Sequence, residues 1–185
     1  MIWLKLIWYI LKYCGLVMLI CAFYMFTLNF LGYPLNTVNI PIVVILWLMI
    51  FSADLRYLWL VIPVGFVLET WSVGSFGLMT LSLIISLAIV SWIFFRVFTN
   101  RSVYIIVLET ILAVVIFRIV FCIFLIIISD LSWSMAMADA ALWWAVGYEI
   151  LTTTSLLLLA YLSTTFLVRY FRPEYIKLNT KGNYV

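Results

Sequence analysis

Three ionisable side chains fall inside long apolar stretches of this sequence: Glu109, Arg118 and Glu149. A charged group in hydrocarbon costs about 2.5–3.5 kcal/mol on insertion scales, so each of them needs a partner or a purpose. On helical geometry Arg118 lies about 16 Å and Glu149 about 10 Å below the same membrane surface, a difference that an arginine side chain can bridge. We therefore predict an intramembrane ion pair between Arg118 and Glu149. The pair either fastens two helices together or takes part in transport or catalysis.

Glu109 is the other acid predicted to be buried, about 9 Å from the opposite surface. Arg96, Arg101 or a water-filled cleft would lie within its reach. Glu109 and Arg118 are nine residues apart, about 180° around a helix, so we do not expect them to pair. An enzyme that modifies lipids through Glu109 or Glu149 would have no second acid at helical spacing and no histidine, because the chain contains none. Histidine is the commonest general base and metal ligand. We therefore predict no enzymatic activity, no metal and no cofactor.

Glu69 stands at the junction of two apolar runs, within the glycine-containing segment 65–78. Glycine lets the backbone reverse sharply and lets neighbouring helices approach closely. We expect this segment to form a corner between two membrane helices. Glu69 itself is then solvated, accepts hydrogen bonds from the backbone amides of residues 72–74, or contacts a partner outside the membrane. The glycines of the corner, three of the chain's seven, are Gly65, Gly74 and Gly77.

The amino-acid composition indicates the environment in which the whole chain lies. Of 185 residues, 69% are hydrophobic and 9% are charged, which leaves too little polar surface for a soluble protein. The sequence therefore predicts an all-α polytopic membrane protein that forms a single transmembrane domain. The six predicted transmembrane helices cover residues 14–31, 38–53, 57–71, 76–98, 103–129 and 142–168, and a basic tail covers residues 169–185.

The placement of the basic residues decides the predicted number of crossings. Cytoplasmic loops accumulate lysine and arginine. With six crossings and a cytoplasmic N-terminus, nine of the ten basic residues lie on the cytoplasmic side, and the exception is Arg118. If residues 40–68 formed one helix, Arg96 and Arg101 would move to the outside. We therefore predict six helices with both termini in the cytoplasm. The basic tail either suits contact with anionic membrane lipids or, as the topology rule favours, merely fixes the orientation of the chain, and no nucleic-acid partner is expected.

The corner resembles the junction between the third and fourth helices of the rod shape-determining protein MreD family. The matching residues are Gly65-Phe66, an acid at Glu69, then Ser72, Gly74 and Gly77-Leu78 at the start of the next long helix. Six short-looped helices, the chain length and the basic turn at 98–102 are also similar. The resemblance implies a non-enzymatic scaffold subunit of the bacterial cell-elongation machinery, which synthesises the peptidoglycan cell wall. It implies a location in the plasma membrane, and partnership with an MreC-like protein and through it with peptidoglycan synthases and the MreB filament.

The same resemblance implies a fold akin to the vitamin-binding S-components of energy-coupling-factor transporters. This kinship supplies an alternative function, a subunit that binds a small molecule in a pocket opening outward between the corner and the last helix. Bulky aromatic side chains near these segments would either close such a cavity or stack on a flat ligand. They are Trp71, Trp133, Trp143 and Trp144.

Overall fold

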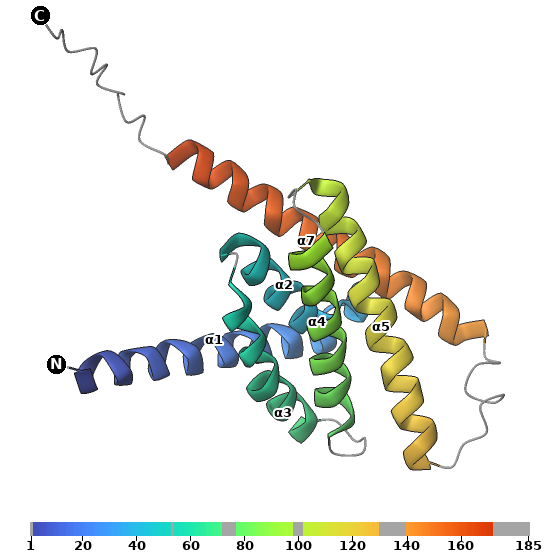
Figure 1. Ribbon diagram of the computed structural model, residues 1–185. Helices are drawn as coiled ribbons and strands as arrows, with labels where there is room; N and C mark the ends of the chain where they lie inside the picture. The colour runs from blue at the N-terminus through green and yellow to red at the C-terminus, as the bar shows by residue number, and fades with distance from the viewer. Residues whose placement is uncertain (1, 53, 72–76, 98–101, 130–139, 172–185) are drawn as a thin grey trace, which may run out of the picture.

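The computed structural model describes residues 2–52, 54–71, 77–97, 102–129 and 140–171, and within these ranges the chain is helical without a β-strand (Figure 1). Two of the elements, η1 and η2, are short 3-10 helices, and the others are α-helices. In chain order they are α1 (Ile2–Phe30), η1 (Leu35–Thr37), α2 (Ile40–Ser52), η2 (Leu55–Leu60), α3 (Val61–Trp71), α4 (Leu78–Val97), α5 (Val103–Ser129) and α7 (Ala140–Phe171).

Four of these helices are long and apolar enough to cross a membrane. Their apolar segments run for 19 to 26 residues, close to the length of about 20 residues that a bilayer requires. The protein is therefore an all-helical, membrane-embedded protein. The four candidate spans are Leu11–Phe30 in α1, Leu78–Arg96 in α4, Val103–Ile128 in α5 and Trp143–Leu167 in α7.

The short helix α2 forms the centre of the bundle. It contacts α1, α3, α4, α5 and α7, and most of its side chains are buried. A helix that is apolar on all sides is stable only when other elements enclose it. The longer helices are therefore arranged around α2, which supplies much of the core. Its buried residues are Ile40, Pro41, Ile42, Val43, Ile45, Leu46, Met49 and Ile50.

Two helices differ clearly from the predicted ranges, whereas α2, α4, α5 and α7 agree with them to within about three residues at each end. α1 begins at Ile2, whereas the sequence analysis placed the first membrane helix at 14–31. The segment predicted as one helix at 57–71 consists of η2 followed by α3. Asp54 begins η2 by accepting a hydrogen bond from the Arg56 backbone amide at 2.9 Å. Pro63 has no amide hydrogen for an α-helical bond to the preceding turn, which favours a break between helices near Val61.

The helices α3, α4, α5 and α7 run in alternating directions, as Figure 1 shows. α4 packs between α3 and α5, and α5 packs against α7. Because α2 also contacts α7, the N-terminal and C-terminal parts of the chain meet in the interior. This arrangement brings the polar residues that follow α1 close to those of α5 and α7.

Candidate functional site

Arg118 on α5 and Glu149 on α7 form a salt bridge inside the bundle. The Arg118 Nε donates to Glu149 Oε2, and the two atoms are 2.5 Å apart. The Glu149 side chain is 2% exposed and the Arg118 side chain 38% exposed, so the anion is enclosed while the cation lies at the edge of the bundle. The structure thus brings together the two residues that the sequence analysis expects to pair.

Asn39 connects this ion pair to α2. The Asn39 Nδ2 donates to Glu149 Oε1 at 3.1 Å, so both oxygens of the carboxylate have a partner within the chain. Asn39 directly precedes α2, and its Oδ1 faces the Ile42 amide nitrogen at 3.5 Å, the arrangement of an N-cap. A single asparagine therefore begins α2 and binds the acid on α7.

Three threonine hydroxyls complete the polar cluster around Glu149. The Asn39 backbone amide donates to Thr153 Oγ1 at 3.2 Å, and the hydroxyl oxygens of Thr37 and Thr152 are 3.3 Å apart. We call Thr37, Asn39, Arg118, Glu149, Thr152 and Thr153 the polar cluster. It joins the segment around η1, the start of α2, α5 and α7 through hydrogen bonds within the chain. These hydrogen bonds hold α2, α5 and α7 in fixed positions relative to one another. They also direct the Glu149 carboxylate toward partners within the same chain.

Of the polar cluster, only Arg118 and Glu149 were predicted from the sequence; the three threonines were missed, and so was Asn39. Its position offers a signal, because an asparagine directly before an apolar run with proline in the first helical turn is a typical helix start. That signal identifies a cap. It does not identify Glu149 as the partner of the side-chain amide, because the two residues are 110 positions apart.

The second candidate acid, Glu69, caps α4 from the neighbouring helix α3. Glu69 is 5% exposed, so it is buried rather than solvated. Its Oε1 accepts a hydrogen bond from the Thr80 backbone amide at 2.8 Å. Thr80 lies in the first turn of α4, where amides have no partner within the helix and the helix dipole attracts an anion. The amides of residues 72–74, considered in the sequence analysis, lie outside the described residues, as does Gly74.

Gly65 and Gly77 shape the corner in different ways. A Cβ atom on Gly65 would lie 2.8 Å from Thr80 Oγ1 and 3.0 Å from Thr80 Cα, closer than side chains approach one another. Glycine is therefore required where α3 meets α4. Gly77 has a φ of +94° directly before α4, a conformation that other residues rarely adopt. Close contact at Gly65 allows Glu69, one helical turn later, to reach the Thr80 amide.

Glu109 is separate from both acids described above. It lies on α5, is 2% exposed, and neither carboxylate oxygen has a hydrogen-bond partner among the described residues. Arg96, one of the expected partners, instead lies over the Trp92 ring, with its Cζ 5.5 Å from the ring centroid. Arg101 lies outside the described residues. The structure therefore does not pair Glu109 with Arg96.

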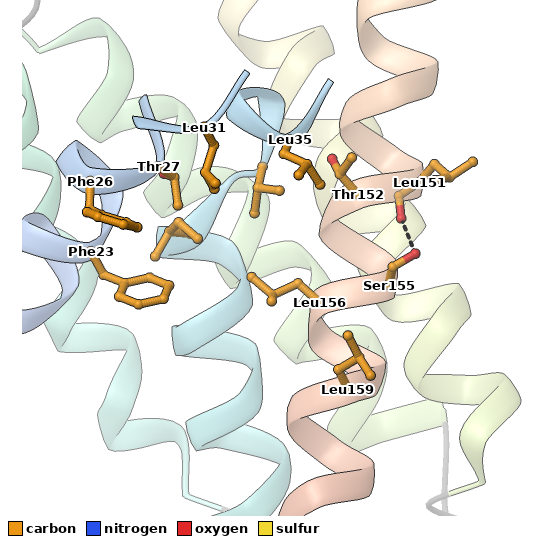
Figure 2. Close-up of a pocket in the computed structure, with 12 residues that line it drawn as sticks. Phe23, Phe26, Thr27, Leu31, Leu35, Leu151, Thr152, Ser155, Leu156 and Leu159 are labelled. Atoms are coloured by element: carbon orange, nitrogen blue, oxygen red, sulfur yellow. Dashed lines mark hydrogen bonds between the residues drawn. The ribbon is translucent and has the colours of Figure 1, made fainter. Parts of the chain in front are cut away.

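A groove of about 290 Å³ lies between α1 and α7, beside η1 and the start of α2 (Figure 2). We call it the α1–α7 groove. Phe23 and Phe26 on α1 face Leu156 and Leu159 on α7 across it, as Figure 2 shows. The pocket anticipated for a vitamin-binding protein would lie between the corner and the last helix, and no residue of the corner lines this groove. The lining residues are Phe23, Phe26, Thr27, Leu31, Leu35, Val38, Ile40, Leu151, Thr152, Ser155, Leu156 and Leu159.

Comparisons with known proteins identify no relative of this chain. No protein-family model, no curated protein and no solved structure matches it. Its function is therefore inferred from the residues and the geometry described above.

Proposed function

We propose that this protein is a non-enzymatic scaffold subunit of the bacterial cell-elongation machinery, similar to the rod shape-determining protein MreD family. The observation that carries the proposal is the use of two buried carboxylates to join helices. Glu69 on α3 accepts from an amide at the N-terminus of α4, and Glu149 on α7 accepts from the residue that caps α2. Both acids lie where the helix dipole favours negative charge. Such contacts give a rigid frame on which membrane partners can assemble.

The polar cluster favours a scaffold over a vitamin-binding S-component. A ligand site needs a few polar groups that converge on a cavity and remain available to the ligand. Here both oxygens of Glu149 are bound to Arg118 and Asn39. The α1–α7 groove has no charged residue in its lining. These features also argue against Glu149 as a general base, since a base must be free to accept a proton from its substrate.

We further propose six membrane crossings, with both termini in the cytoplasm of a bacterial cell. α2 has 13 residues and is about 20 Å long, but the surrounding helices enclose it, so its ends need not reach the lipid headgroups. The six residues of η2 and the eleven of α3 together extend about 28 Å, close to the hydrocarbon thickness of about 30 Å. We therefore propose that α2 and the combined η2–α3 segment each cross the membrane within the bundle.

Reporter fusions test this topology. A reporter fused after Gly74 or after Met135 is expected to read periplasmic, and one fused after Asn100 is expected to read cytoplasmic, because basic loops remain inside. The three fusion points lie in successive connections between helices and control for one another. A periplasmic signal after Asn100 would contradict six crossings without bearing on the helices themselves.

Identification of the native partners tests the scaffold function. The protein is cross-linked in its native membranes, purified and analysed by mass spectrometry. We expect an MreC-like protein and peptidoglycan synthases, and we expect rod-shaped cells to become round when the protein is depleted. Recovery of transporter ATPases, with cell shape unchanged, would replace the proposal with the S-component function. A protein of equal abundance from the same membranes, purified in parallel, serves as the control.

A further inference from the structure

We propose that the α1–α7 groove binds one acyl chain of a membrane phospholipid. This proposal requires only that the protein is embedded in a membrane, so it does not depend on the scaffold function. Phe23 and Phe26 lie within the candidate span Leu11–Phe30, and the lining residues of α7 lie within Trp143–Leu167. Half of the side chains that line the groove are exposed, including Phe26 at 50% and Leu159 at 65%. It therefore opens sideways onto the hydrocarbon of the bilayer.

The lining offers no free hydroxyl hydrogen to an occupant. Its three hydroxyl groups donate to backbone carbonyl oxygens of their own helices: Thr27 to Tyr24 at 2.7 Å, Thr152 to Tyr148 at 2.8 Å and Ser155 to Leu151 at 2.7 Å. The other lining side chains are apolar. An acceptor group of a polar ligand would lose its hydrogen bonds to water on entering, and no hydroxyl hydrogen of the lining is free to replace them. The chemistry of the lining therefore selects hydrocarbon.

The size of the groove distinguishes an acyl chain from a partner helix. An apolar cavity of about 150 Å³ accommodates the six carbons of benzene, so about 290 Å³ accommodates roughly twelve carbons. One turn of an α-helix with its side chains, about 10 Å wide and 5.4 Å long, occupies roughly 400 Å³. A helix therefore does not fit into the groove, whereas most of one acyl chain does.

The position of the groove along α7 places it in the hydrocarbon region of the bilayer. Its lining residues on this helix run from Leu151 to Leu159, within the candidate span Trp143–Leu167. Leu151 lies about 12 Å and Leu159 about 24 Å along the helix from the Trp143 end of that span. An acyl chain in the groove would therefore lie at the depth of the lipid hydrocarbon, which is about 30 Å thick.

Photo-cross-linking with a labelled lipid tests this site. The full-length protein is reconstituted in phosphatidylethanolamine vesicles that contain a trace of the same lipid with a diazirine midway along one acyl chain. After illumination, peptide mass spectrometry maps the adducts. We expect an excess on peptides containing Phe23–Phe26 and Leu156–Leu159 over those containing the outward-facing Trp92 of α4 and Ile119 of α5. An even distribution over all lipid-facing helices would overturn the proposal.

Two matched variants of α7 separate the groove from its surroundings. Ser155→Trp places an indole ring in the groove, whereas Ser163→Trp places one on the same helix outside the lining. Both serines are exposed and donate only to their own helix. We expect Ser155→Trp to abolish the excess labelling and Ser163→Trp to preserve it, with equal helicity by circular dichroism.

Two further results are decisive, one from these variants and one from a separate cross-linking experiment. Undiminished labelling of Ser155→Trp would overturn the proposal. So would a photoreactive amino acid at position 155 that cross-links to another protein in native membranes, because a partner chain would then cover the groove. If Ser155→Trp does not fold, the adduct map of the unmodified protein alone decides the question.

Discussion

Substitution of Glu149 with glutamine removes the anion opposite Arg118 while preserving the shape of the side chain. An arginine does not lose its proton in a protein, so Arg118 would remain charged in apolar surroundings. Breaking a buried ion pair costs about 3–5 kcal/mol. Because the Arg118 side chain is 38% exposed and can extend toward a polar region, we expect the lower end of this range, about 3 kcal/mol.

Removal of the cation instead, by Arg118→Met, is expected to lower the free energy of unfolding by less, about 1–2 kcal/mol. Glu149 would keep the hydrogen bond from Asn39 Nδ2, and a carboxyl group, unlike a guanidinium, can be neutralised by a proton. The double variant leaves no unpaired charge and should cost no more than Arg118→Met alone. The sum of the single effects then exceeds the double effect by at least about 3 kcal/mol, the upper end for residues in direct contact.

The free energies of unfolding of the four proteins are compared in lipid bicelles by steric trapping. Arg56→Met serves as the control, because Arg56 also pairs with an acid, Asp54 at 3.6 Å, but is 83% exposed. We expect that control to change stability by less than about 1 kcal/mol. Single effects that add to within about 0.5 kcal/mol of the double effect would refute the coupling of Arg118 and Glu149. A larger cost for Arg118→Met than for Glu149→Gln would refute the argument from unpaired charge.

Three further substitutions test the helix junctions by the same measurement. Gly65→Ala should lower the free energy of unfolding by about 1–3 kcal/mol because the added Cβ meets Thr80. Gly147→Ala is the control, and it should be neutral or stabilising because its added Cβ meets nothing within 4 Å. Equal effects of the two substitutions would contradict the close contact. Glu69→Ala should cost about 1–2 kcal/mol by removing the cap of α4, and Glu69→Gln, which retains an acceptor oxygen, should cost less; the reverse order would contradict capping. Asn39→Ala should cost about 1–2 kcal/mol through the lost cap and the lost donor to the polar cluster, and an unchanged stability would show that neither contributes.

The Arg118–Glu149 contact follows from the sequence because charge in hydrocarbon is costly and helical rise limits the depth of each residue. The contact of Glu69 with Thr80 does not follow in the same way. It joins a side chain to a backbone amide eleven positions later, and every residue except proline has such an amide. Only the close approach of α3 and α4 at Gly65 selects the amide of Thr80. The glycine indicates that a close approach is possible, and the packing determines which residue meets it.

For Glu109, the sequence predicts that the side chain is buried but does not identify its surroundings. Its burial is expected from the apolar residues around it, and the structure buries it. Its expected contact with Arg96 does not form, because Arg96 lies over Trp92 on its own helix. A flexible side chain near a helix end has several partners within reach, and the sequence spacing does not rank them.

Composition and the placement of charge suffice to establish that this chain is helical and lies in a membrane, because so few polar residues cannot cover a soluble protein. They do not establish that α2 is the enclosed helix or that α1 and α7 border a groove. Lipid tails are as apolar as leucine, so hydropathy does not distinguish a side chain that faces lipid from one that faces protein. That distinction depends on shape, and shape arises only when the helices pack.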